Sequence, residues 1–245
     1  MAILEISGVS KNFGGLPALR DVSFEVEKGD IVGVIGPNGA GKTTLLNCIS
    51  GLFPLSAGVV ELSGQVVSGL KPHQVCRAGM GRTFQIPRPF GRMTVIENLG
   101  VSNRHPGRDL RPFLETVGLS EKTNVPANRL TFHERRRLEL ARALSTDPQV
   151  LLLDEIMAGL NPTETVEMVA LMRSIHQGTG LTILWIEHVM RAIMESAYRL
   201  VVLHQGQKLL EGSPQEIARH PQVVEIYLGE KYQFKGNSHA SGQTA

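Results

Sequence analysis

Three short runs along the chain are mainly apolar, and each ends in glycine or an acidic residue. These runs cover residues 31–36, 150–155 and 181–187. Continuous apolar runs of this length are typical of strands buried on both faces, as in parallel sheets. Elsewhere Val22, Phe24 and Val26 alternate with polar residues, and this period of two predicts a half-buried strand. The pattern therefore predicts two kinds of sheet.

The half-buried strand fits an N-terminal antiparallel sheet. Residues 3–6 and 58–67 also have strand character, with a hairpin turn at Ser63-Gly64. Residues 201–212 predict a final hairpin around Gln205-Gly206.

Helical patterns lie between the strands. One runs through residues 42–50 to Gly51, which is a suitable helix end because glycine readily adopts the left-handed conformation. Another begins at Pro162 and carries apolar residues three positions apart: Val166, Val169, Met172 and Ile175. Strands that alternate with helices predict an α/β fold with a mostly parallel sheet.

The stretch from residue 86 to 145 lacks strand patterns and contains helical ones, so it predicts an inserted helical subdomain. The last residues are small and polar, which predicts a flexible tail. The predicted parts are an α/β core with an antiparallel β-subdomain at 1–85 and 146–231, a helical subdomain at 86–145 and a tail at 232–245.

Composition narrows the classes of protein. The 245 residues fit one domain with an insertion, and a net charge of +2 argues against binding nucleic acid through bulk charge. Two cysteines, Cys48 and Cys76, are too few for a disulfide scaffold and indicate a reducing compartment. The start lacks a signal-peptide pattern, and no apolar run approaches the ~20 residues that cross a bilayer. We therefore expect a cytoplasmic chain, or one that reaches a membrane only through a partner.

A glycine-rich segment follows the first buried strand and leads into a helix, the context that a phosphate-binding loop requires. The segment consists of Gly36, Pro37, Asn38, Gly39, Ala40, Gly41, Lys42, Thr43 and Thr44. Its three glycines allow successive main-chain N–H groups to point at a polyphosphate, and the helix N-terminus adds favourable partial charge. Lys42 can bridge the terminal phosphates, and the Thr43 hydroxyl can ligate Mg²⁺. The segment therefore predicts a nucleotide site.

The second buried strand ends in two carboxylates, Asp154 and Glu155. Because strand residues alternate between faces, the two side chains can serve different centres. Asp154 would reach Mg²⁺ through water, and Glu155 would orient or deprotonate the attacking water. Acidic residues often follow strands, so this interpretation depends on the glycine-rich loop in the same α/β frame.

Together these motifs resemble the ATP-binding subunit of an ATP-binding-cassette transporter, over roughly residues 3–230. The set consists of Phe13, the loop at 36–44, Arg82-Thr-Phe-Gln85, Asp154-Glu155 and Ile186-Glu-His188. Three further segments most resemble the subunits that power branched-chain amino-acid importers: 82–99, 159–164 and 220–230. The resemblance implies a P-loop NTPase core, with ATP and Mg²⁺ as cofactors.

The resemblance also implies roles for single residues. Phe13 would stack on adenine, although a core aromatic is the alternative. Gln85 would contact Mg²⁺ or the attacking water at the hinge to the helical subdomain, although alone it would be a surface residue. His188 would contact the γ-phosphate and sense hydrolysis, although a lone histidine is more often a core or surface residue.

The signature of the family, which completes the ATP site of the opposite subunit in a sandwich dimer, is altered. The matching residues are Thr131, Phe132, His133 and Glu134. His133 replaces a glycine whose main-chain N–H approaches the partner's γ-phosphate, so its side chain should obstruct that approach. A charged imidazole is an alternative donor. The change fits a heterodimer with one strong and one weak site.

Three smaller features accompany this change. Ile156 and Met157 stand where a proline commonly follows the glutamate, and the stretch between Asn98 and Leu130 is shorter than the branch usually has. Arg135, Arg136 and Arg137 fit a solvated helix face, with phosphate contact as the alternative.

We interpret the chain as the ATP-hydrolysing subunit of an importer of branched-chain amino acids, or of related small amides or urea. The expected partners are a second cassette, transmembrane permease subunits and, indirectly, a substrate-binding protein, with no nucleic acid. Its place would be the inner face of the cell membrane. Alternatives are an ATP-binding regulatory protein and a P-loop kinase, although no Arg-rich lid is evident. Non-transport cassettes usually carry long inserts or two cassettes.

Overall fold

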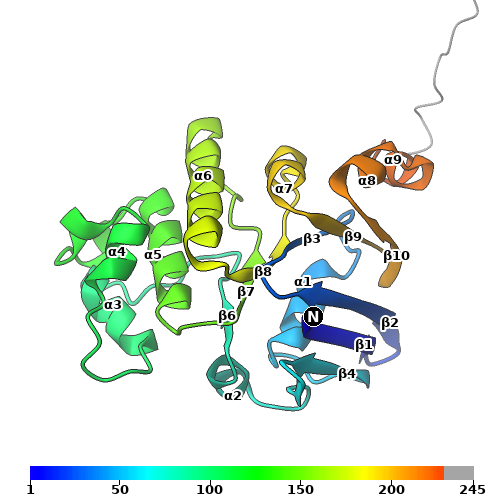
Figure 1. Cartoon of the computed structure of the whole chain (residues 1–245), viewed down its shortest axis with the longest axis horizontal. Helices are drawn as coiled ribbons and strands as arrows, with labels where there is room; N and C mark the ends of the chain where they lie inside the picture. Colours follow the sequence, from blue (N-terminus) through cyan, green and yellow to red (C-terminus); the bar gives the residue numbers. More distant parts are fainter. Residues whose placement is uncertain (229–245) are drawn as a thin grey trace, which may run out of the picture.

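A six-stranded, mostly parallel sheet forms the centre of the computed structural model, which describes residues 1–228 (Figure 1). Its order is β10-β9-β3-β8-β7-β6, and only β10 is antiparallel to its neighbour. The strands are β3 (Ile31–Ile35), β6 (Met80–Arg82), β7 (Val150–Asp154), β8 (Thr182–Ile186), β9 (Arg199–His204) and β10 (Gln207–Gly212). The three apolar runs are β3, β7 and β8, and every residue in them is buried. The predicted parallel sheet is confirmed.

An antiparallel sheet packs beside it, in the order β2-β1-β4-β5. Its strands are β1 (Ala2–Phe13), β2 (Leu16–Glu27), β4 (Ala57–Leu62) and β5 (Gln65–Val66). The two predicted hairpin turns are present, because φ is positive at both Ser63 and Gly64 and at both Gln205 and Gly206. Two consecutive residues with positive φ match the twist of antiparallel strands.

The parallel sheet has a separate core on each face. Ile31 and Ile35 of β3 belong to the cluster with the helices, whereas Val32 and Val34 belong to the cluster with the antiparallel sheet. The helices of the α/β part are α1 (Lys42–Ile49), α2 (Pro72–Arg77), α6 (Pro162–Thr179), α7 (Met190–Ser196), α8 (Pro214–Arg219) and α9 (Pro221–Leu228). Helix α1 ends as predicted, with Gly51 at φ 74° just beyond it.

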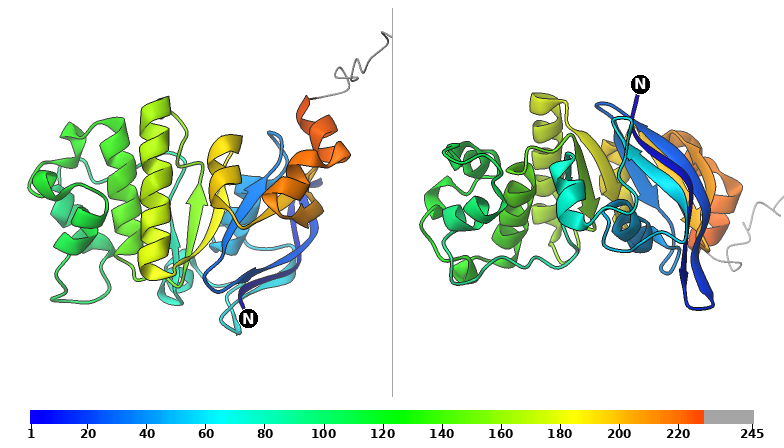
Figure 2. Two further views of the ribbon diagram at one scale, coloured as in Figure 1. Left: turned by 45° about the horizontal axis from the view of Figure 1, so that its top comes forward. Right: turned by 90° about the horizontal axis from the view of Figure 1, so that it is seen from below.

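Between residues 86 and 145 the structure has helices, two 3-10 turns and one isolated bridge. These elements are α3 (Val95–Ser102), α4 (Arg111–Thr116), η1 (Ser120–Lys122), η2 (Ala127–Arg129) and α5 (Phe132–Leu144). Figure 2 shows that this group lies to one side of the parallel sheet, away from the antiparallel sheet. Helix α5 is the member next to the parallel sheet and contacts β6.

The interpretation of Arg135–Arg137 as a solvated face is wrong for Arg136, which is only 4% exposed. The side of α5 that carries Arg136 faces the segments at Phe84 and Ala158. Two of the Arg136 guanidinium nitrogens donate to main-chain carbonyls, and its buried Nε has no hydrogen-bond partner among residues 1–228. No local pattern in the sequence distinguishes a buried arginine of this kind from its two neighbours.

The predicted tail at 232–245 lies outside the described residues. Within residues 1–228 no helix combines the length and apolar character needed to cross a bilayer. Cys48 and Cys76 are both free thiols.

Candidate functional site

The glycine-rich loop joins the carboxyl end of β3 to α1, and two of its glycines are required by close packing. A Cβ at Gly36 would lie 2.2 Å from the Leu203 carbonyl oxygen, and one at Gly41 would lie 2.9 Å from the Ala18 carbonyl oxygen. Gly39 has open space around it but a φ of 81°, so its backbone conformation is what favours glycine. The loop conformation therefore depends on these glycines for two different reasons.

The loop is also held by the last hairpin of the sheet. The Gly206 N–H donates to the Ala40 carbonyl at 3.0 Å, and the Arg20 N–H donates to the Gly206 carbonyl at 2.8 Å. A Cβ at Gly206 would meet the Ala18 carbonyl oxygen at 2.6 Å. The turn between β9 and β10 thus joins the loop to β2.

Lys42, the first residue of α1, folds back into the loop. Its Nζ donates to the carbonyl oxygens of Gly36 at 2.7 Å and Pro37 at 3.0 Å. Burial lowers the pKa of Lys42, and the nearby carboxylates of Glu155 and Asp154 oppose that shift. The ammonium therefore lies in the curve of the loop, where it can exchange these carbonyls for phosphate oxygens.

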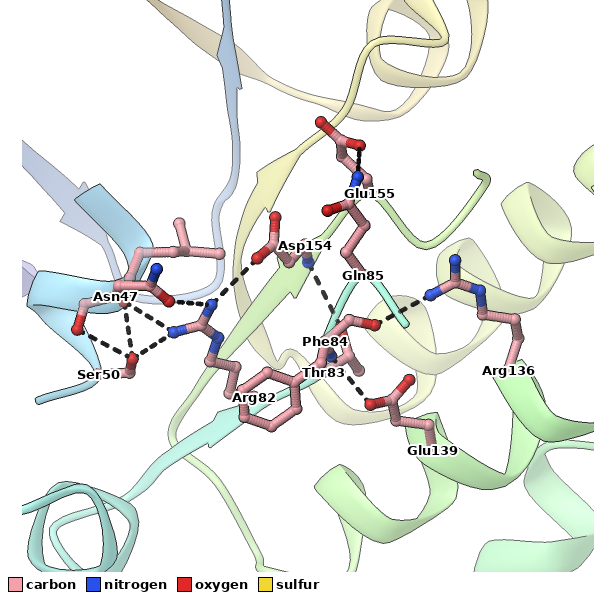
Figure 3. Close-up of polar contacts among 11 residues, drawn as sticks. Asn47, Ser50, Arg82, Thr83, Phe84, Gln85, Arg136, Glu139, Asp154 and Glu155 are labelled. Carbon is pink, nitrogen blue, oxygen red and sulfur yellow. Dashed lines mark hydrogen bonds and ion pairs between the residues drawn. The ribbon is translucent and has the colours of Figure 1, made fainter. Parts of the chain in front are cut away.

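Asp154 ends β7 and is nearly fully buried. Its Oδ2 accepts a hydrogen bond from Arg82 at 3.0 Å, and Arg82 also donates to the Asn47 side chain at 2.8 Å (Figure 3). Its Oδ1 is buried and has no hydrogen-bond partner among residues 1–228. An unpartnered buried carboxylate oxygen is costly, and it fits a position that reaches a bound Mg²⁺ or its water.

Glu155 follows with a φ of 48°, a conformation that is uncommon for a residue other than glycine. This turn directs its side chain to Gln85, whose Nε2 donates to Glu155 Oε2 at 2.6 Å (Figure 3). The same oxygen lies 3.7 Å from His188 Nδ1. The structure therefore brings together the three side chains that were predicted to act in catalysis: Gln85, Glu155 and His188.

Glu187 is a further residue of the site, to which the sequence analysis gave no role. Its carboxylate is fully buried and accepts the main-chain N–H groups of His188, Val189 and Met157, at 3.1, 3.3 and 3.2 Å. Burial raises its pKa, and these three hydrogen bonds oppose the shift. Glu187 thereby ties the residues after β8 to those after Glu155. Its position at the end of a mainly apolar, fully buried strand was the available signal.

Phe13 packs against two residues to which the sequence analysis gave no role. Its ring packs edge-to-face against Phe53, with centroids 5.3 Å apart, and Lys11 Nζ lies 5.0 Å from the Phe13 centroid. Phe13 is 44% exposed, so one part of the ring remains accessible. Its predicted contact with adenine stays a prediction.

The altered signature forms the start of α5. Thr131 caps the helix and exchanges hydrogen bonds with Glu134. His133 Nε2 accepts a hydrogen bond from Arg137 Nε at 3.1 Å, which requires an unprotonated nitrogen. Burial and Arg137 lower the pKa of His133. The alternative of a charged imidazole as phosphate donor is therefore not supported by this geometry. The N–H groups of Phe132 and His133 are the first of the helix and have no intrahelical acceptor.

Comparisons with known proteins agree with this arrangement. Residues 19–158 match the ABC transporter family, and residues 207–232 match the branched-chain amino acid ATP-binding cassette transporter family. The chain is 40% identical to the high-affinity branched-chain amino acid transport ATP-binding protein BraF of Pseudomonas aeruginosa. It is 39% identical to LivG of Escherichia coli, a protein of the same description. Each alignment covers 93% of this chain and 98% of the relative.

Solved structures show the same fold. A nucleotide-free ATP-binding cassette from an ABC transporter superimposes with a TM-score of 0.85 at 31% identity. The ADP conformation of an ATP-binding cassette of an ABC transporter gives a TM-score of 0.84 at the same identity. Both alignments cover 94% of this chain and the whole of the other chain.

Proposed function

The chain belongs to the ATP-binding cassette transporter family, and from this premise we propose that it hydrolyses ATP to energise an importer of branched-chain amino acids. The relatives that carry this description match over nearly their whole length. The match at residues 207–232 supports the branched-chain amino acid branch in particular.

The structural observation that best supports the proposal is the position of the site residues in the parallel sheet. The residues gather at the carboxyl ends of parallel strands: Asp154 ends β7 and Glu155 follows it, His188 lies two residues beyond β8, and Lys42 begins the helix after β3. Ligands of open α/β sheets bind at this edge. The cleft over the loop is lined by Lys42, Thr43 and Glu155 together, so phosphate binding and water activation can occur at one place.

The residues fit a division of labour. Main-chain N–H groups of the loop and Lys42 would bind the phosphates. Thr43, Asp154 and Gln85 would hold Mg²⁺, which supplies neutralisation of phosphate charge. Glu155, held by Gln85 beside His188, would orient and deprotonate the attacking water.

The partners follow from the family. We propose that the chain pairs with a second cassette, in a heterodimer, and binds permease subunits at the inner face of the membrane. A separate substrate-binding protein would deliver the amino acid. The free main-chain N–H groups at the start of α5 are the surface that would face the second cassette.

The test uses cells that lack this chain and the purified full chain. Uptake of labelled leucine, isoleucine and valine should fall when the chain is absent and return when it is supplied. The purified chain should release phosphate from Mg-ATP, and its membrane partners should stimulate that release. Unchanged uptake would contradict the importer assignment, and ATP binding without hydrolysis in the complete assembly would favour a regulatory protein.

The signature supports a further prediction. We expect His133→Gly to raise the ATP turnover of the assembled complex, because the change removes the Cβ beside the N–H groups that approach the partner's phosphate. A gain of about tenfold or more would be consistent with one restored donor. Phosphate release at saturating Mg-ATP is the measurement.

His133→Ala is the matched control, since it removes the imidazole and keeps the Cβ. The imidazole already points back to Arg137, so we expect His133→Ala to leave turnover near the wild-type value. A loss of activity in His133→Gly at equal folded fraction would show that the side chain does not obstruct the partner's site.

A further inference from the structure

Arg136 joins two segments that are far apart in the sequence. Its Nη1 donates to the Phe84 carbonyl at 3.0 Å, and its Nη2 donates to the Ala158 carbonyl at 3.1 Å. Phe84 immediately precedes Gln85, and Ala158 lies three residues after Glu155. One buried guanidinium therefore binds the main chain of the two segments that carry Gln85 and Glu155.

Glu139 holds the same peptide from the other side. It lies three residues after Arg136, on the same face of α5. Its Oε1 accepts the Phe84 N–H at 3.0 Å, while Arg136 binds the Phe84 carbonyl (Figure 3). The main-chain N–H and carbonyl of Phe84 therefore both bond to side chains of α5.

The chemistry of these two side chains is unusual for the interior. Glu139 is 7% exposed, and burial raises its pKa to about 7. Within residues 1–228 neither Glu139 nor Arg136 takes part in an ion pair. Buried charged groups are costly unless they make strong hydrogen bonds. Here Glu139 Oε1 and the two terminal nitrogens of Arg136 bond to main-chain atoms, whereas Glu139 Oε2 and Arg136 Nε have no partner among residues 1–228. Their placement is explained by the segments they hold.

The start of α5 contacts the second segment as well. The Phe132 ring lies beneath the Arg136 guanidinium, with 5.1 Å between Cζ and the ring centroid. A Cβ at Gly159 would lie only 3.0 Å from Phe132 Cε1, so the ring packs directly on the residue after Ala158. A displacement of the first turn of α5 would therefore move both segments.

We propose that Arg136 and Glu139 are positioning residues, which fix the segments carrying Gln85 and Glu155 to α5 and so couple the start of that helix to both side chains. This inference rests on the proposed function, because the coupled side chains act only in an ATPase. The residues touch no nucleotide; they act through the main chain of Phe84 and Ala158.

The first test is a set of variants at Glu139 in the full chain. Glu139→Leu removes the acceptor and should lower kcat at least tenfold, with the Kd for Mg-ATP within threefold of wild type. Glu139→Gln keeps an oxygen acceptor and should restore most of that loss. In a Gln85→Ala background, Glu139→Leu should lower kcat less than twofold further, because its effect passes through Gln85. If Glu139→Leu lowers kcat by the same factor in the Gln85→Ala background as in the wild type, its effect does not pass through Gln85 and the inference is wrong.

The second test does not depend on turnover. Amide hydrogen exchange should be faster in residues 82–86 for Glu139→Leu, and faster in both 82–86 and 156–160 for Arg136→Met. Arg135→Met is the matched control on the same helix, since its guanidinium binds the Asn128 carbonyl instead, and it should change neither segment. Exchange equal to wild type in both segments would overturn the inference. If the variants show these exchange changes but the wild-type chain hydrolyses no ATP, only the proposed function is contradicted.

Discussion

Glu155→Gln is expected to lower the maximal rate of ATP hydrolysis by about 10²–10⁴-fold, the usual contribution of a positioned general base. Glutamine has nearly the same shape and can keep a hydrogen bond to Gln85. It cannot take a proton from water at neutral pH. Binding of Mg-ATP should therefore survive, and the variant should accumulate as a closed, ATP-loaded dimer. Phosphate release and size-exclusion chromatography with Mg-ATP measure the two effects.

The control is the same substitution at Glu195, an exposed carboxylate on α7 that pairs with Arg191. Glu195→Gln should hydrolyse ATP at the wild-type rate and form no trapped dimer. If Glu155→Gln turns over ATP as fast as the wild type, another group is the base. The distance of 3.7 Å between Glu155 and His188 would then make the histidine the next residue to test.

Lys42→Ala is expected to weaken Mg-ATP binding by about 10²-fold or more, equivalent to about 3 kcal/mol. Hydrogen bonds to a charged group contribute about 1.5–3 kcal/mol each, and the buried ammonium can make several with the terminal phosphates. Alanine removes the hydrogen bonds to the Gly36 and Pro37 carbonyls but adds no bulk to the loop. Isothermal titration with Mg-ATP measures the loss directly.

Lys71→Ala, at an exposed position before α2, is the control and should bind Mg-ATP with unchanged heat and affinity. Circular dichroism should show that Lys42→Ala remains folded. If Lys42→Ala binds Mg-ATP as tightly as the wild type, the loop does not bind phosphate as proposed, and the proposed function is contradicted.

Local patterns predicted the parts of the fold that a short window of sequence determines. The strands β3, β7 and β8 are buried on both faces, so each is a mainly apolar run. The hairpins at Ser63-Gly64 and Gln205-Gly206 lie between strand patterns. The proximity of Gln85, Glu155 and His188 was predictable because these residues follow such strands or match family motifs.

Long-range contacts determine what the sequence analysis missed. Strand β6 has only three residues, and its pairing with β7 defines it. Arg136 differs from Arg135 and Arg137 only in what packs against it after folding. Glu187 is recognisable as a ligand of main-chain N–H groups only when the ends of β7 and β8 are side by side.

The turn at Gly206 has a consequence for how the chain matures on the ribosome. The loop at 36–44 is synthesised well before Gly206, which joins it to β2. Strand β3 likewise lies between β8 and β9, both translated much later. A nascent chain thus contains every loop residue long before the surroundings that shape it. The loop can therefore reach its final conformation only after the β9–β10 hairpin has been synthesised.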